Sequence, residues 1–214
     1  NTSSEELYTP RSSQQEIIDF IIEDLDKAIP LLPKQSGLTA EELGRTTQGA
    51  ALALKARAAL FEGTWQKYHG MADAGKYLDL AIQAAQAIVD SKEYELYREK
   101  GELSYKYLHI LEGDDSKEVL LARQYYKLRA THNWTRELLL GAMVPTKNLA
   151  DVYLCTDGLP IDKSKLFKGF QTQTSEFENR DSRMAQTFVV PGSEIFSEGG
   201  GWATVEPGFI GNNS

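Results

Sequence analysis

The stretch at residues 44–61 (GRTTQGAALALKARAALF) constrains the fold more than any other part of this chain. It reads as a glycine turn, two threonines that can cap a helix, and a helix built largely from alanine. Alanine has the highest helix propensity, and its short side chain lets a partner helix approach closely. The stretch therefore predicts a helix over 48–63 in a tightly crossed helix pair, the repeating unit of helical solenoids. The small residues recur at helical spacing: Ala50, Ala53, Ala56 and Ala59.

Two further helices are predicted by the periodicity of apolar residues. Ser13 and Glu16 form a capping box in front of a stripe of isoleucine and leucine, which predicts a helix over 14–32. A third helix is predicted over 74–90, and together the three form a mostly α-helical scaffold in residues 1–110. The residues expected to be buried on the third helix are Tyr77, Leu78, Ala81, Ile82, Ala84, Ala85, Ile88 and Val89.

The second half of the chain, residues 111–214, is expected to be a loop-rich part of the same domain. Residues 118–126 have a composition typical of β-structure, which predicts a short strand or an extended segment. Pro145 opens a short helix that runs to about Tyr153, and glycines interrupt the sequence from Lys163 onward. Because binding function tends to lie in loops on a rigid scaffold, we expect the binding residues in this half.

Charge and composition exclude some classes of partner. Acidic residues outnumber basic residues 31 to 23, which leaves a net charge of −8. This balance argues against a nucleic-acid partner, because such a partner requires a basic face. No apolar run approaches the roughly 20 residues of a membrane-spanning helix. Residues 1–7 lack a signal pattern and the sequence ends in a Gly/Asn-rich stretch, so we expect a piece of a longer protein.

The sequence carries no recognisable catalytic or metal-binding motif. Its three histidines lack the spacing of a zinc site, and the single cysteine, Cys155, cannot form a thiolate cluster. The triple glycine at 199–201 lacks the strand–turn–helix context of a dinucleotide-binding loop. We therefore predict no enzymatic activity, no metal and no cofactor. Two acids that are distant in sequence can still meet in space, so a glycoside hydrolase remains an alternative.

Aromatic residues near the loops are the candidates for a ligand-binding surface. Tyrosine and tryptophan present a flat apolar face with one polar tip, which suits the C–H face of a sugar ring. Trp134 is the first candidate because its neighbours are polar, and Trp202, beside the triple glycine, is the second. Asn133 and Arg136 would supply hydrogen bonds to hydroxyl groups if the local chain is a loop. The alternative is that these aromatic side chains fill the joint between scaffold and loops.

Five short segments along the chain match the pattern of a known family. Two are the end of the first helix at 24–33 (DLDKAIPLLP) and the alanine-rich stretch at 44–61. Three lie downstream, at 145–149 (PTKNL), 157–161 (DGLPI) and 179–183 (NRDSR). In this order the segments resemble the SusD/RagB family, the glycan-binding lipoproteins of the Bacteroidetes outer membrane. Ser182 stands where that family often has proline.

The resemblance implies a mostly helical protein whose tetratricopeptide-like helix pairs support irregular loops. It also implies non-catalytic capture of oligosaccharides at the cell surface and delivery to a SusC-type TonB-dependent transporter. The membrane would be reached only through a lipid anchor outside residues 1–214, because Cys155 lies in mid-chain. The family's sugar-contacting residues do not lie at a fixed motif, so the aromatic candidates rest on their chemistry alone. The alternative from another class is a helical-repeat adaptor that binds a protein or peptide through charged side chains.

Overall fold

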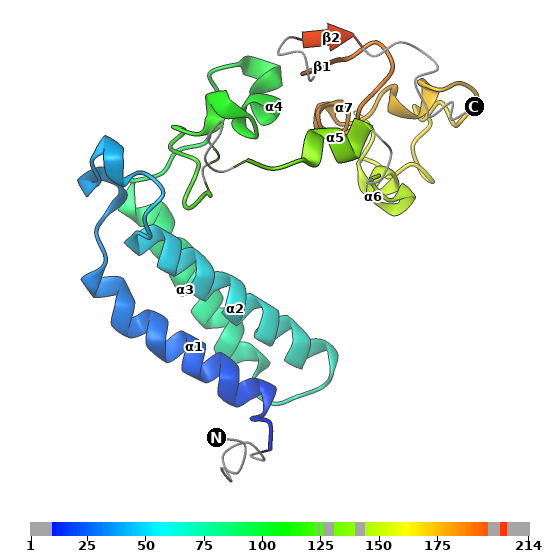
Figure 1. Cartoon of the computed structure of the whole chain (residues 1–214). Coiled ribbons are helices and arrows are strands. Elements are labelled where there is room, and N and C mark those ends of the chain that lie inside the picture. Colours follow the sequence, from blue (N-terminus) through cyan, green and yellow to red (C-terminus); the bar gives the residue numbers. More distant parts are fainter. Residues whose placement is uncertain (1–9, 124, 126–130, 140–143, 197–201, 205–214) are drawn as a thin grey trace, which may run out of the picture. The chain divides into compact units, whose positions relative to one another are not determined.

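The structure, a computed structural model, describes residues 10–123, 125, 131–139, 144–196 and 202–204, and within them it is mostly helical, as predicted (Figure 1). The chain divides into two compact units. The first comprises Asn1–Leu96 with Asp115–Gln124, and the second comprises Tyr97–Asp114 with Tyr125–Ser214. The predicted division into a scaffold at 1–110 and a loop-rich part at 111–214 stays a prediction.

The first helix, α1 (Gln14–Ala28), begins at the predicted capping box. The Ser13 hydroxyl accepts a hydrogen bond from the Glu16 backbone N–H at 3.2 Å, and the Glu16 carboxylate accepts one from the Ser13 backbone N–H at 2.7 Å. The backbone hydrogen bond from Ser13 is the main reason why the pKa of Glu16 is lowered. A 3-10 turn, η2 (Ile29–Leu31), follows and contains Pro30, so the helical stretch ends one residue before the predicted end.

Two long helices, α2 (Gln48–Tyr68) and α3 (Ala74–Ser91), form a helical hairpin, and α1 packs along it (Figure 1). The prediction for α3 is correct within one residue. The prediction that α2 ends at Gly63 is wrong, because the helix continues for five more residues. Two further 3-10 turns follow η2 before α2 begins: η3 (Gln35–Gly37) and η4 (Ala40–Glu42).

The core of the first unit lies where the three helices meet. Ile18 and Ile22 of α1 pack with Ala59 of α2 and with Tyr77 and Ala81 of α3. Burial of these apolar side chains, at about 25 cal/mol per Å² removed from water, is the main force that holds the helices together. The Tyr77 ring is fully buried.

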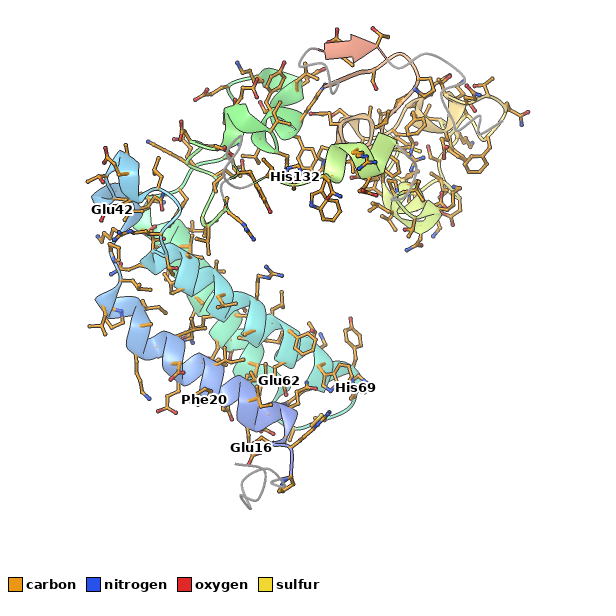
Figure 2. All side chains as sticks on the ribbon, in the orientation of Figure 1. Glu16, Phe20, Glu42, Glu62, His69 and His132 are labelled. Carbon is orange, nitrogen blue, oxygen red and sulfur yellow. The ribbon has the colours of Figure 1, made fainter. Side chains whose placement is uncertain are left out.

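Polar side chains join the same three helices at their edges. The Tyr77 hydroxyl donates a hydrogen bond of 2.8 Å to the Asp19 carboxylate, which links α3 to α1. The Glu62 carboxylate, which is 1% exposed, accepts hydrogen bonds from the side chains of Gln14 at 2.7 Å and Gln66 at 2.9 Å (Figure 2). A buried carboxylate with two donors avoids the cost of an unsatisfied charge.

The alanine pattern predicts that a neighbouring segment approaches α2 closely. In the structure such close approaches occur at two glycines of α2, Gly49 and Gly63. Ala50 and Ala59 are buried, whereas Ala53 and Ala56 are only half-buried. Gly49 lies against the ring of Tyr94, and Gly63 lies so close to α3 that a Cβ there would be 2.8 Å from Leu78 Cγ.

The predicted buried set of α3 is only partly correct. Tyr77, Ala81 and Ala84 are buried, but Ile82 and Val89 are 65% and 60% exposed. Ala85 is also exposed. The predicted positions cover more of the helix circumference than the stripe that faces α1 and α2, so part of the set lies outside the core.

We expect Thr47→Ala to destabilise the first unit by about 1–2 kcal/mol, because Thr47 is the N-cap of α2. Its fully buried hydroxyl accepts from the Ala50 backbone N–H at 3.3 Å and is hydrogen-bonded to the Tyr94 hydroxyl at 3.2 Å. Urea unfolding followed by circular dichroism measures the loss. The exposed neighbour Thr46 is the matched control, and an equal effect of Thr46→Ala would contradict the assignment of the cap.

The second unit consists of short helices and turns with one small sheet. Its described helices are α4 (Ser104–Leu108), α5 (Trp134–Leu139), α6 (Lys147–Val152) and α7 (Ser182–Thr187), with 3-10 turns η5 (Gly101–Leu103), η6 (Leu111–Gly113) and η7 (Ser175–Phe177). Two strands, β1 (Glu194–Phe196) and β2 (Trp202–Thr204), pair antiparallel with Ile195 opposite Ala203. Residues 118–123 and 125 form no strand, so of the two predicted alternatives, strand or extended segment, the strand is wrong for these residues.

In the described parts of the chain, no helix combines the length and the apolar character that crossing a lipid bilayer requires.

Candidate functional site

The structure places the first predicted binding residue, Trp134, at the start of a helix. Its side chain is 52% exposed. The roles of Asn133 and Arg136 depended on a loop here, and that condition is not met, because the chain is helical over Trp134–Leu139. Arg136 therefore lies about 200° around the helix from Trp134 and does not share a face with it. Asn133 precedes the helix, and its amide donates a hydrogen bond of 2.9 Å to the Glu137 carboxylate.

The surroundings of Trp134 are polar and aromatic. The His132 ring accepts a hydrogen bond of 3.3 Å from the Trp134 backbone N–H and packs edge-on against Tyr125 with 4.8 Å between ring centres (Figure 2). Trp202 begins β2, opposite Phe196, and its side chain lies outside the described part of the structure. A binding role for Trp134 and Trp202 stays a prediction.

An open pocket of about 230 Å³ lies in the second unit, among residues of α4, α6 and α7. Its walls combine two tyrosines, three aliphatic side chains and one ion pair. None of these residues is among the predicted site residues. They are Tyr105, Leu149, Val152, Tyr153, Leu154, Asp181 and Arg183.

One wall of the pocket is built by the segment at 179–183, one of the five family-like segments. Asp181 is the N-cap of α7, and its carboxylate accepts from the Arg183 backbone N–H and from Arg183 Nε, each at 2.9 Å. A further bond from the guanidinium makes the ion pair two-pronged. The side-chain hydrogen bond from Arg183 lowers the pKa of Asp181, against the opposing effect of burial, and the same bond raises the pKa of Arg183. Both groups are therefore charged at neutral pH.

Arg180 fixes this segment against α6. Its guanidinium is buried and donates to three backbone carbonyl oxygens: those of Ala150 at 2.6 Å, Tyr153 at 2.8 Å and Glu176 at 3.0 Å. The ring of Phe167 lies 5.4 Å from the guanidinium carbon. Carbonyl groups at the end of a helix have no partner within the helix, and Arg180 supplies one.

The segments at 145–149 and 157–161 also have a structural role. The Thr146 hydroxyl caps α6 by accepting from the Leu149 backbone N–H at 3.2 Å. The Asp157 carboxylate accepts from the Leu159 backbone N–H at 3.1 Å and from the Ser164 hydroxyl at 2.8 Å. Gly158 follows with φ of 76°, a conformation that favours glycine. These bonds hold the backbone that carries the pocket.

Tyr105 of α4 also lines the pocket, and Gln186 of α7 holds this helix in place. The Gln186 side chain accepts from the Lys106 backbone N–H at 2.9 Å and donates to the Glu102 carbonyl at 3.0 Å. The Tyr105 side chain on α4 is 39% exposed, and its ring packs against His109 with 4.7 Å between ring centres. The lining of the pocket thus combines aromatic rings with a planar pair of hydrogen-bonding groups.

The described residues contain no group of three or more His, Cys, Asp or Glu side chains that could hold a metal ion. The features that the pocket does offer, aromatic rings with planar donors and acceptors, suit a ligand rich in hydroxyl groups.

Neither a family model nor a curated protein matches this sequence. Among solved structures, the crystal structure of a SusD-like protein from Bacteroides fragilis NCTC 9343 superposes on 92% of the chain with a TM-score of 0.67 and 25% sequence identity. The chain has a SusD-like fold. A SusD-like carbohydrate-binding protein from the same strain matches 87% of the chain with a TM-score of 0.64 and 19% identity, a level that shows the fold alone.

The SusD-like match confirms the resemblance that the five segments indicate, and it covers both units of the chain. The chain spans 39% of the length of the first SusD-like protein and 34% of the second.

Proposed function

We propose that this chain is part of a cell-surface protein that binds oligosaccharides without cleaving them. The observation that carries the proposal is the SusD-like fold over 92% of the chain. The α2–α3 hairpin then corresponds to one of the tetratricopeptide-like helix pairs of the scaffold. The aromatic and planar polar side chains exposed in the second unit provide the types of group that bind sugars.

The proposal includes a partner and a location. By analogy with the SusD/RagB family, the protein passes its glycan to a SusC-type TonB-dependent transporter. It would lie on the outer face of the outer membrane, held by a lipid anchor outside residues 1–214. Two observations would contradict this part: a failure of the protein to co-purify with such a transporter, and its absence from the outer-membrane fraction.

Affinity electrophoresis of the purified protein in gels that contain single polysaccharides tests the binding proposal. Retardation without release of sugars supports capture. Released sugars would favour a glycoside hydrolase with an unrecognised carboxylate pair. If the protein is neither retarded nor releases sugars, the result would favour a helical-repeat adaptor for a protein or peptide.

We predict that Trp134→Ala lowers the affinity for a retarding glycan about 5- to 100-fold, because stacking on an aromatic ring contributes about 1–3 kcal/mol. The melting temperature should change little, because the side chain is 52% exposed. Isothermal titration calorimetry and thermal unfolding of the same variant measure both quantities. Trp65→Ala, at a position 43% exposed on α2, is the matched control. Lost stability with unchanged affinity would remove Trp134 from the binding surface.

A further inference from the structure

We propose that the pocket among α4, α6 and α7 is a separate subsite for a single neutral sugar ring. The Tyr105 ring stacks on the sugar, and the Asp181–Arg183 pair binds its hydroxyl groups. This inference rests on the proposed function, since it assigns a ligand class to a site within a glycan-binding protein.

The size of the pocket favours one ring over a longer ligand. Pockets for drug-sized molecules span about 300–1,000 Å³. A volume of about 230 Å³ is smaller than this range, and the pocket is open on one side. A terminal sugar ring, or one ring of a longer chain that continues into solvent, fits such a space.

The aromatic wall supplies the apolar contact. Tyr105 lies on α4, whose backbone is held by hydrogen bonds from Gln186, and its ring packs against His109 with 4.7 Å between ring centres. Tyr153, the second tyrosine, has its hydroxyl hydrogen-bonded to Thr187 at 2.9 Å and its ring packed edge-on against Phe188. Side chains that are already ordered lose little conformational entropy on binding.

The ion pair supplies the polar contacts. A guanidinium has five N–H donors, and the bonds to Asp181 use Nε and one terminal nitrogen of Arg183. The Arg183 side chain is 60% exposed, so its remaining donors face solvent, and 24% of the Asp181 side chain is exposed as an acceptor. Adjacent hydroxyl groups on a sugar can donate to the carboxylate and accept from the guanidinium at the same time.

The charge balance favours a neutral sugar over an acidic one. Asp181 and Arg183 are the only charged residues among the seven that line the pocket, and they are paired with each other. A uronic acid would have to bring its carboxylate next to Asp181 or displace Asp181 from Arg183. Displacement would break the two guanidinium hydrogen bonds to Asp181. Hydroxyl groups require neither change.

The test uses the purified protein with two kinds of probe: neutral oligosaccharides of galactose, mannose, xylose or glucose, and oligogalacturonides as the charged counterpart. Calorimetry with the tightest neutral probe is expected to show about a tenfold loss of affinity for Tyr105→Ala and for Arg183→Gln. Tyr105→Phe keeps the ring and should bind within twofold of the wild type. Val152→Phe adds bulk to the wall of the pocket without removing a polar contact, and it should also weaken binding.

Several outcomes would overturn the inference, and they are distinguishable from failure of the proposed function. If the wild type binds a neutral glycan but folded Tyr105→Ala, Arg183→Gln and Val152→Phe proteins bind it equally well, the pocket is not a subsite and the proposed function stands. If only oligogalacturonides bind, the neutral class is wrong. If no glycan binds, both proposals fail. Tyr68→Ala, at a position 83% exposed on α2, controls for a general effect of removing a surface tyrosine.

Discussion

Replacement of Arg180 by alanine is expected to destabilise the second unit by roughly 3–5 kcal/mol, because the change removes a buried cation that satisfies three carbonyl groups. The guanidinium is 5% exposed and joins the end of α6 to the turn η7 and to its own segment. Its loss leaves carbonyl oxygens without a donor and creates a cavity beside Phe167. Thermal unfolding and limited proteolysis within residues 144–196 measure the effect.

Arg183→Ala is the matched control, because it removes an arginine from the same segment at an exposed position. Its pairing with Asp181 lies at the surface, where an ion pair contributes little to stability. Arg180→Lys should lie between the wild type and Arg180→Ala, because an ammonium group keeps the charge but lacks the planar fork that reaches several carbonyls. Equal melting temperatures for the two alanine variants would show that Arg180 does not hold the segment.

The scaffold can be predicted from sequence because its signals are local. The capping box at Ser13 and Glu16 and the spacing of isoleucine along α1 determine a helix start and a buried face without reference to distant residues. Thr47 is one of two candidates for the cap of α2, and the structure selects it. The predicted end of α2 is wrong because Gly63 favours a helix end by itself, whereas here the glycine lies inside the helix where α3 approaches.

The pocket cannot be predicted in this way because its residues come together only through long-range contacts. The segment at 179–183 stands out as a family-like motif, but its sequence does not reveal that Arg180 bonds the carbonyl of Ala150, 30 positions earlier. The same holds for Gln186, whose side chain bonds the backbone of α4 and the adjoining turn, 80 and 84 positions earlier. The motif match thus identifies residues that line the pocket, but it does not show that a pocket is formed there.

The sequence leaves the local structure at Trp134 undecided for a different reason. Polar neighbours are typical of loops, but asparagine before a helix is also a common start signal. Here Asn133 precedes α5, and its carbonyl accepts from the Glu137 backbone N–H at 3.0 Å. The polar residues are therefore consistent with an exposed helix. The exposed side chain of Trp134 is the reason to test this residue for a role in glycan binding.

Gly63→Ala is expected to destabilise the first unit by about 1–3 kcal/mol, although alanine is normally the better helix former by about 1 kcal/mol. A Cβ at this position would lie 2.8 Å from Leu78 Cγ and 2.9 Å from the Leu78 backbone nitrogen. The leucine side chain can rotate away, but the backbone nitrogen can move only if α3 shifts as a whole. Urea unfolding of the wild type and the variant gives the difference in free energy.

Gly75→Ala in the same hairpin separates the cost of this contact from the gain in helix propensity. Gly75 lies in the first turn of α3, and no atom lies within 4 Å of the Cβ that alanine would add. This variant should be more stable than the wild type by up to about 1 kcal/mol. We therefore expect the same replacement of glycine by alanine to lower the free energy of unfolding at Gly63 and to raise it at Gly75. If Gly63→Ala were also stabilising, α2 and α3 would not be in contact at Leu78, and the small residues of α2 would reflect helix propensity alone.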